Sequence, residues 1–216
     1  MSDWAGKYVI GLTGNIATGK SLVCRMLEQL GAYGIDADRL AHRVIKRGSP
    51  GYQPALDEFG REILTTEGEI DRSKLANVVF SDPEKLLRLE AIIHPLVGQE
   101  IDQEMQNIDQ TVVVIEAIKL IESGLNQRCD TLWVTWSTPT LQVERLLDDR
   151  KIQYSDANQR INAQPPQELK TAQADIVINN VSSLQDTWEQ VVAAWLKIFP
   201  ESPVPAAMPE LDTCQK

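Results

Sequence analysis

Residues 14–21 carry two glycines, a lysine and a serine at a spacing suited to phosphate binding. The segment fits the pattern GxxxxGK[ST], directly after an apolar run and directly before an amphipathic helical pattern. The glycines let the backbone curl so that consecutive N–H groups and a helix N-terminus face the β- and γ-phosphates. We expect the lysine to add charge and act in catalysis, and the serine to hold Mg²⁺. The expected ATP-binding residues are Gly14, Asn15, Ile16, Ala17, Thr18, Gly19, Lys20, Ser21 and Leu22.

Two aspartates, Asp36 and Asp38, follow the next apolar run. In an extended segment, residues i and i+2 project to the same side, so both carboxylates could face one site. An aspartate beyond the carboxyl end of a parallel strand can accept a hydroxyl proton or hold a metal-bound water. We expect both aspartates to bind the acceptor, with Asp38 as the catalytic base and as a metal ligand beside Ser21. The alternative is that Asp38 only caps the following helix.

Five basic or titratable side chains follow at helical spacing: Arg39, His42, Arg43, Lys46 and Arg47. Positions i, i+3, i+4, i+7 and i+8 lie on one side of a helix, so the pattern indicates a local anion site. We expect His42 and Arg43 to bind substrate. The alternative is a solvated basic face.

Arginines also gather in and beside the polar segment 148–170, at Arg145, Arg150 and Arg160. Such a segment can act as a lid whose arginines close over transferring phosphates and exclude water. We expect Arg145 to be catalytic and Arg150 to bind substrate, although a surface role is an equal alternative for any one of them. Glu116 is interpreted as a plain strand-end acid, with the alternative that it orients a Mg²⁺-bound water. His94 is interpreted as a structural histidine, with catalysis as the alternative.

The elements that must position these residues are five short apolar runs separated by helical patterns. The runs cover residues 8–12, 33–35, 111–115, 132–136 and 176–178. Near-continuous apolar strands alternating with helices predict a parallel sheet covered on both faces. The predicted fold class is therefore α/β, with a five-stranded parallel sheet. A stripe from Leu22 to Leu30 predicts the first helix, which should stop at Gly31.

The organisation predicted is a single domain over residues 1–199. Residues 38–105 are too long for one crossover helix and are expected to be a helical, substrate-binding insertion, while residues 148–170 are the expected lid. Residues 200–216 contain several prolines and no helical period, which predicts a disordered tail.

Composition excludes several classes. The chain has 21 Lys and Arg against 31 Asp and Glu, a net charge of −10, which argues against nucleic acid as a partner. No apolar stretch approaches the roughly 20 residues of a membrane span, and no signal peptide is recognisable, so we expect a cytoplasmic protein. Three widely spaced cysteines and two histidines favour neither disulfides nor a zinc site. We expect a monomer or a weak homo-oligomer.

The motifs together resemble the dephospho-CoA kinase family of P-loop kinases. The resemblance covers about residues 7 to 198. It rests on the phosphate loop and on Asp36-Ala37-Asp38, then on Glu69-Ile70-Asp71-Arg72, Ile93-His94-Pro95 and Gln164. It ends with the run from Ala174 to Asn180.

This resemblance implies ATP-dependent phosphorylation of the ribose 3′-hydroxyl of dephospho-CoA, the last step of coenzyme A synthesis, with Mg²⁺ as cofactor. It implies a core, a helical CoA domain and a lid, with Asp38 as base and Thr13 beside the substrate. The chain departs from the family at residues 118–122, which read Ile-Lys-Leu-Ile-Glu instead of Pro-Leu-Leu-Phe-Glu. It also has Asn15, Ala17 and Thr18 where the family has Gly, Gly and Ser, changes that we expect the loop to tolerate.

Two alternatives remain from the sequence. A kinase acting on nucleoside monophosphates would share the loop and the lid. A non-catalytic nucleotide-binding regulator would normally carry a base-specificity signal such as NKxD, which the sequence lacks.

Overall fold

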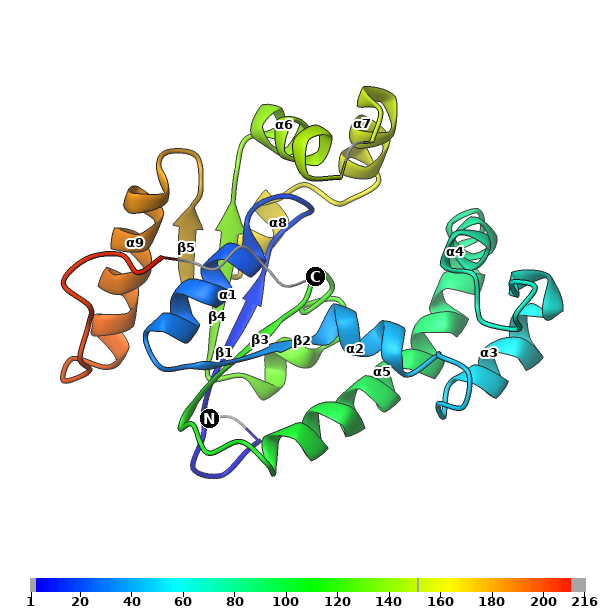
Figure 1. Cartoon of the computed structure of the whole chain (residues 1–216), viewed down its shortest axis with the longest axis horizontal. Coiled ribbons are helices and arrows are strands. Elements are labelled where there is room, and N and C mark those ends of the chain that lie inside the picture. Colours follow the sequence, from blue (N-terminus) through cyan, green and yellow to red (C-terminus); the bar gives the residue numbers. More distant parts are fainter. Residues whose placement is uncertain (1–2, 151, 211–216) are drawn as a thin grey trace. The chain divides into compact units, whose positions relative to one another are not determined.

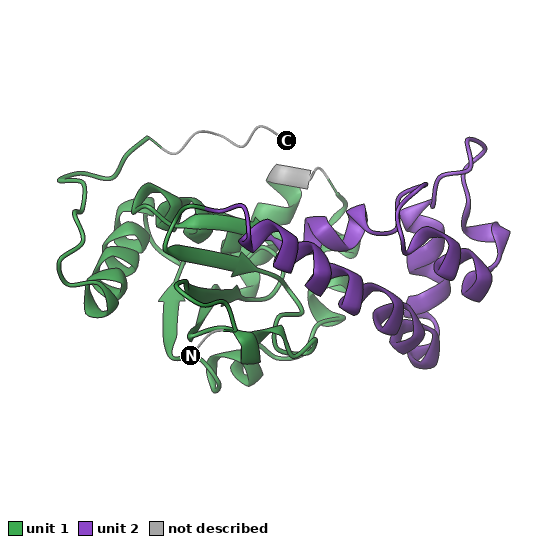
Figure 2. Cartoon of the chain, turned by 90° about the horizontal axis from the view of Figure 1, so that it is seen from below, with its two compact units in different colours: residues 1–35, 109–216 green, residues 36–108 purple. Residues whose placement is uncertain are grey.

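The computed structural model describes residues 3–150 and 152–210, without the side chains of residues 149 and 150. The chain divides into two compact units, coloured separately in Figure 2. Unit 1 contains residues 1–35 and 109–216, and unit 2 contains residues 36–108.

Unit 1 is built on a five-stranded sheet of order β2-β3-β1-β4-β5 (Figure 1). Each apolar run predicted as a strand is confirmed, with ends that shift by one residue. The strands are β1 (Tyr8–Thr13), β2 (Tyr33–Asp36), β3 (Val112–Glu116), β4 (Thr131–Trp136) and β5 (Ile176–Asn179). The helices are α1 (Lys20–Gln29), η2 (Leu125–Arg128), α6 (Pro139–Arg150), α7 (Tyr154–Asn162), α8 (Glu168–Thr171) and α9 (Leu184–Ile198).

The sheet is parallel, as predicted. Strand β1 lies at its centre and pairs in parallel with β3 and β4, while β4 pairs in parallel with β5. Leu12 is in register with Glu116, so β1 and β3 reach the same edge of the sheet together. The turns after both strands are therefore presented at one edge, where ligands of open parallel sheets bind.

Each face of the sheet is covered by a different part of unit 1. Helices α1 and α9 pack together against Ile10 and Leu12, which are both fully buried. Gly11 alternates to the other face, where a Cβ atom would lie only 2.8 Å from Leu120 and 3.0 Å from Cys129. The segment between β3 and β4 therefore covers this face closely enough to require glycine.

Helix α1 ends as the sequence predicts. Its last residue is Gln29, and Gly31 follows with φ of +100°. That left-handed conformation is free of strain only for glycine, which explains why the helix stops there.

Unit 2 is helical. A long helix, α5 (Pro83–Met105), contacts the three others, α2 (Ala37–Arg43), α3 (Tyr52–Phe59) and α4 (Arg72–Phe80), and a short turn η1 (Arg61–Ile63) joins α3 to α4. Side chains cap three of these helices: Asp36 caps α2, Asp71 accepts hydrogen bonds from the N–H groups of Ser73 and Lys74 in α4, and Asp82 accepts one from Glu84 in α5. These caps satisfy N–H groups that a helix start leaves without partners.

Residues 200–210 carry no helix or strand, yet Val204 and Met208 pack against the core under α1 and α9. The rest of the predicted disordered tail, residues 211–216, lies outside the described residues.

Cys24 and Cys129 are free thiols, and burial raises the pKa of Cys129 to about 12. Within the described part of the chain, no helix has the length and apolar character to cross a membrane.

Candidate active site

The phosphate loop occupies the turn between β1 and α1. Gly14 has φ of +154°, and a Cβ atom there would lie 2.3 Å from the Thr135 hydroxyl. Gly19 has φ of +97°, and a Cβ atom there would lie 1.9 Å from the Asn180 amide nitrogen. Glycine is therefore required at both positions for two reasons. The backbone has a positive φ, and the ends of β4 and β5 leave no room for a Cβ atom.

Ala17 occupies a loop position whose backbone conformation favours glycine. Ala17 has φ of +58°, and no other non-glycine residue of the described chain has a positive φ. The left-handed conformation costs a residue with a Cβ atom about 1 kcal/mol or more. The loop therefore holds Ala17 in a strained conformation, which is a physical consequence of its departure from the family pattern.

The N-terminus of α1 lies open for an anion. Gly19 precedes the helix without a side-chain cap, and its first turn contains no acidic residue. The Lys20 ammonium group donates to the carbonyl oxygens of Gly14 at 3.1 Å and Asn15 at 3.4 Å. Backbone N–H groups, the positive end of the helix dipole and one ammonium group thus converge on the loop.

A hydroxyl and a carboxylate meet beside this helix start. The Ser21 hydroxyl donates to Glu116 Oε1 at 3.2 Å, and Glu116, at the end of β3, is only 8% exposed. From the sequence, Ser21 is the expected metal ligand, and a Mg²⁺ role is only the alternative for Glu116. The feature that indicates a site role for Glu116 is the parallel pairing of β1 and β3, which aligns Glu116 with Leu12 beside the phosphate loop.

Arg145 lies on α6 and contacts the phosphate loop. Its guanidinium donates to the carbonyl oxygen of Ala17 at 3.1 Å, to the Ser137 hydroxyl at 3.2 Å and to the carbonyl oxygen of Asn180 at 2.8 Å. The structure therefore brings Arg145 to the loop itself. The side chain of Arg150 lies outside the described residues.

The segment after α7 also contacts the loop. The Ile16 N–H donates to Gln164 Oε1 at 2.7 Å, and the Asn15 amide donates to the carbonyl oxygen of Pro165 at 2.9 Å. Ile16 and Ala17 also pack against a small apolar cluster formed by α6 and α7. The segment 148–170, expected to be a lid, is thus joined to the loop by both polar and apolar contacts.

Thr13, expected to bind substrate, is the last residue of β1. Its side chain is fully buried, and its hydroxyl donates to the carbonyl oxygen of Ile118 at 3.1 Å. The same carbonyl oxygen accepts from Lys170 at 2.6 Å, and Lys170 forms an ion pair with Glu122 at 2.8 Å. The divergent segment 118–122 is thereby fastened to β1 and to α8.

The prediction that residues 36–38 are extended holds for Asp36, the last residue of β2, and is wrong for Ala37 and Asp38, which are helical. The Asp36 carboxylate accepts a hydrogen bond from the Arg39 N–H at 2.8 Å and caps α2, which already begins at Ala37. Asp38 lies in the first helical turn. The cap is therefore Asp36 and not Asp38, so the alternative role considered for Asp38 belongs to its neighbour.

The prediction of one basic helical side from Arg39 to Arg47 is also wrong, because α2 ends at Arg43. Lys46 and Arg47 lie in the turns that follow. The Arg47 backbone donates to Glu69 and its guanidinium to the carbonyl oxygen of Glu67, both at 3.2 Å.

His42 joins α2 to α4. Arg72 donates to His42 Nε2 at 2.7 Å, which requires the histidine to be neutral at that nitrogen. Burial and the nearby Arg72 charge lower the pKa of His42 from its ordinary value of 6.5.

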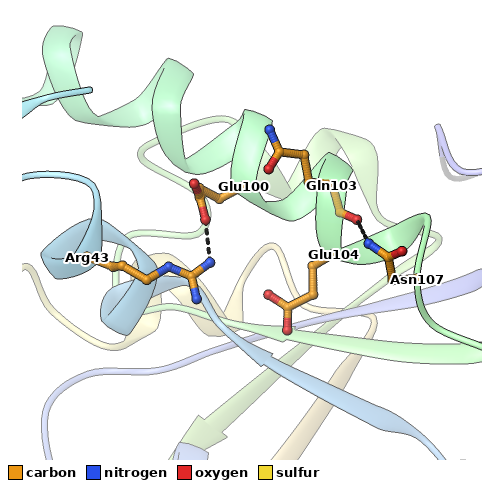
Figure 3. Close-up of a pocket in the computed structure, with 5 residues that line it drawn as sticks. All are labelled: Arg43, Glu100, Gln103, Glu104 and Asn107. Atoms are coloured by element: carbon orange, nitrogen blue, oxygen red, sulfur yellow. Dashed lines mark hydrogen bonds and ion pairs between the residues drawn. The ribbon is translucent and has the colours of Figure 1, made fainter. Parts of the chain in front are cut away.

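Arg43 lines a pocket of about 260 Å³ in unit 2, shown in Figure 3 with Glu100, Gln103, Glu104 and Asn107. Its guanidinium forms an ion pair with Glu100, a dashed line in Figure 3. An anion that binds Arg43 must therefore compete with this carboxylate.

Comparisons with known proteins are consistent with this geometry. The dephospho-CoA kinase family model matches residues 8–186. A dephospho-CoA kinase from Carboxydothermus hydrogenoformans is 41% identical over 187 residues, which cover 85% of this chain and 91% of the relative.

Two solved structures are also similar. A protein from Thermus thermophilus superimposes with a TM-score of 0.79 at 30% identity, covering 89% of this chain and 97% of that one. A dephospho-CoA kinase from Campylobacter jejuni superimposes with a TM-score of 0.63 at 28% identity and the same coverage.

Proposed function

The chain belongs to the dephospho-CoA kinase family, and from that premise we propose how its residues carry out the reaction. The enzyme uses ATP to phosphorylate dephospho-CoA in CoA biosynthesis. In our proposal the acceptor is the ribose 3′-hydroxyl. The observation that carries the proposal is the phosphate loop, with its glycines, Lys20 and uncapped α1 start, in a chain that matches the family over most of its length.

Residues 14–22 bind the phosphates of ATP. Phosphoryl transfer depends on positioning and on stabilising charge that builds on the γ-phosphate oxygens, so fixed N–H donors and a lysine contribute directly. Lys20 already lies against the loop carbonyl oxygens, within the curve that would surround the phosphates. Lys20 is therefore the proposed catalytic lysine.

Ser21 and Glu116 are the residues that would hold Mg²⁺ on the loop, and Asp38, expected from the sequence as a metal ligand, remains a proposed further ligand. A hydroxyl and a buried carboxylate 3.2 Å apart offer the hard oxygen ligands that Mg²⁺ prefers. Among the residues described, no group of three or more His, Cys, Asp or Glu side chains could hold a metal. This fits a Mg²⁺ site, which commonly uses one or two protein ligands and the substrate phosphates. When bound, the ion neutralises charge on the phosphates.

Asp38 serves as the base that accepts the proton of the acceptor hydroxyl. The hydroxyl oxygen forms a bond to the γ-phosphorus while the bond from that phosphorus to the β–γ bridging oxygen breaks, and ADP leaves. The proton passes to the Asp38 carboxylate. Asp36 supports this role by capping α2 so that the helix begins at Ala37, which places Asp38 in its first turn.

The parts of the chain divide the remaining tasks. Residues 38–105 bind the acceptor, with His42 and Arg43 contacting it, and residues 148–170 form a lid with Arg145 and Arg150. The proposed place of action is the cytoplasm, and the proposed state is a monomer or weak homo-oligomer.

The test is product identity. Purified protein is incubated with ATP, Mg²⁺ and dephospho-CoA, and the product is analysed by mass and by sensitivity to a 3′-specific nucleotidase. We expect one added phosphate that the nucleotidase removes. Lys20→Ala should abolish turnover in a folded protein, and wild-type turnover by that variant would overturn the loop assignment.

A further inference from the structure

Three side chains from outside the phosphate loop hold three consecutive loop carbonyl oxygens. Gln142 Nε2 donates to the carbonyl oxygen of Ile16 at 2.7 Å. Arg145 donates to that of Ala17 at 3.1 Å, and Asn180 Nδ2 donates to that of Thr18 at 3.0 Å. Gln142 and Arg145 come from α6, and Asn180 follows the end of β5.

These contacts determine which way the loop peptides face. In a planar trans peptide the C=O of one residue and the N–H of the next point in opposite directions. If the carbonyl oxygens of residues 16, 17 and 18 point outward to these side chains, the N–H groups of Ala17, Thr18 and Gly19 point inward. The Thr18 N–H has this inward direction, because it donates to the carbonyl oxygen of Asn15 across the loop at 3.4 Å.

The two amide side chains are built into the structure. Gln142 is 1% exposed and Asn180 is 3% exposed. The carbonyl oxygen of Asn180 anchors Arg145, and its side-chain oxygen accepts from the Thr187 hydroxyl at 3.2 Å. Burying a polar amide is unfavourable unless it is hydrogen-bonded, so these side chains are positioned by their contacts with the loop and its supports.

We propose that Gln142, together with Arg145 and Asn180, is a positioning residue that turns the phosphate loop's N–H groups toward the triphosphate. Without these donors the peptides between residues 16 and 19 would be free to rotate, and ATP would have to order them on binding. This matters most at Ala17, whose left-handed backbone is strained and needs outside support. The inference rests on the proposed binding of ATP to this loop.

Gln142→Met tests the proposal, because methionine has a similar length and no donor or charge. We expect the KM for ATP and the Kd for inorganic triphosphate to rise together by about 5- to 20-fold, the range expected for a lost buried hydrogen bond. The KM for dephospho-CoA should stay within about twofold, because the substitution acts on the phosphate loop. A general loss of folded protein would instead lower kcat. Gln173→Met is the matched control: Gln173 also donates to a backbone carbonyl oxygen, at 2.8 Å, but on the exposed surface of α8 and its C-terminal turn.

Unchanged triphosphate and ATP binding in a folded Gln142→Met protein would overturn the proposal. If that variant does not fold, Gln142→Asn serves instead, because it keeps the amide but shortens the side chain below the reach of Ile16. Triphosphate binding needs no turnover. Failure of the wild type to phosphorylate dephospho-CoA would therefore count against the proposed function alone.

Discussion

At the scale of single residues, the site depends on side chains whose backbone position matters as much as their chemistry. Asp38 is the clearest case, because the neighbouring Asp36 provides the helix cap. Asn and Asp are nearly equivalent as caps, so replacing Asp38 by Asn would have no effect if it were a cap. As a base, however, Asp38 needs a carboxylate.

We therefore expect Asp38→Asn to lower kcat by about 10²- to 10⁴-fold, the usual contribution of general-base catalysis. ATP binding should be nearly unchanged. Steady-state kinetics and ATP calorimetry on the same preparation measure both quantities. Near-normal kcat would remove Asp38 from the proton transfer, and Asp57→Asn, at an exposed position of α3, is the matched control.

Ala17 offers a stability measurement. Ala17→Gly removes the left-handed strain but loosens the unfolded chain, so we expect the free energy of unfolding to rise by up to about 1 kcal/mol. The same substitution at exposed Ala91 in α5 should lower it by about 1 kcal/mol, the cost of glycine in a helix. Denaturant titrations of both variants decide the sign. A loss at position 17 equal to that at position 91 would contradict the strain.

At the scale of elements, the buried ammonium group of Lys170 connects α8 to the segment after β3. Lys170 is 4% exposed and donates to Ile118 and to both oxygens of Glu122, whose side chain is 41% exposed. The lysine has lost most of its water, whereas the glutamate keeps part of its own. The pair therefore depends mainly on the lysine being satisfied by these three acceptors.

Lys170→Met should lower the free energy of unfolding by about 1 to 3 kcal/mol, less than for a fully buried pair because Glu122 can be hydrated. Exposed Lys85→Met should change it by less than about 0.5 kcal/mol. Adding Glu122→Gln to Lys170→Met should cost little more, since the partner has gone already. Independent, additive losses from the two substitutions would show that the ion pair does not couple α8 to this segment.

A second contact between elements makes stability depend on pH. Because burial and Arg72 lower the pKa of folded His42 below 6.5, the unfolded chain takes up the proton first as the pH falls. The stabilisation is thus complete above about pH 6.5 and is lost as the pH falls through the folded pKa.

His42→Gln should remove this dependence. We expect the stability difference between wild type and His42→Gln to be constant above about pH 7 and to shrink below about pH 6. Denaturant titrations between pH 5 and 8 measure it. A difference that grows on acidification would contradict the lowered pKa.

At the scale of the whole molecule, an acidic chain must bind two anionic substrates. The net charge is −10, and the cations that unit 2 offers are partly engaged: Arg43 pairs with Glu100, and Arg47 donates to the carbonyl oxygen of Glu67. Anion binding is therefore local and depends on N–H groups and a few placed cations. An acceptor with a pyrophosphate at a distance from its reacting hydroxyl has an additional group through which to be positioned.

We expect kcat/KM for dephospho-CoA to exceed that for AMP by at least about 10²-fold, which corresponds to about 2.7 kcal/mol of transition-state discrimination. Competition assays with both acceptors at limiting concentration give the ratio. Preferential phosphorylation of AMP would transfer the chain to the nucleoside monophosphate kinase alternative.

The sequence by itself determined the local parts of this protein. Apolar runs and helical periodicity predict all five strands and α1, and the glycines and lysine of residues 14–21 predict the phosphate loop. Each of these signals lies within a short stretch of chain, where backbone preferences and side-chain periodicity act directly. The local prediction is wrong at residues 37–47, because the Asp36 side chain caps a helix that begins at Ala37 and ends at Arg43.

Only the tertiary structure decided which residues support the loop. Gln142, Asn180 and Gln164 contact it from 126, 162 and 148 residues away in the sequence, and Glu116 meets Ser21 from 95 residues away. A lone glutamine or asparagine gives no periodic signal, since its role depends on which backbone group the folded chain brings to its amide. That choice is made by the parallel pairing of the strands and the packing of α6, which place distant parts of the chain against one loop.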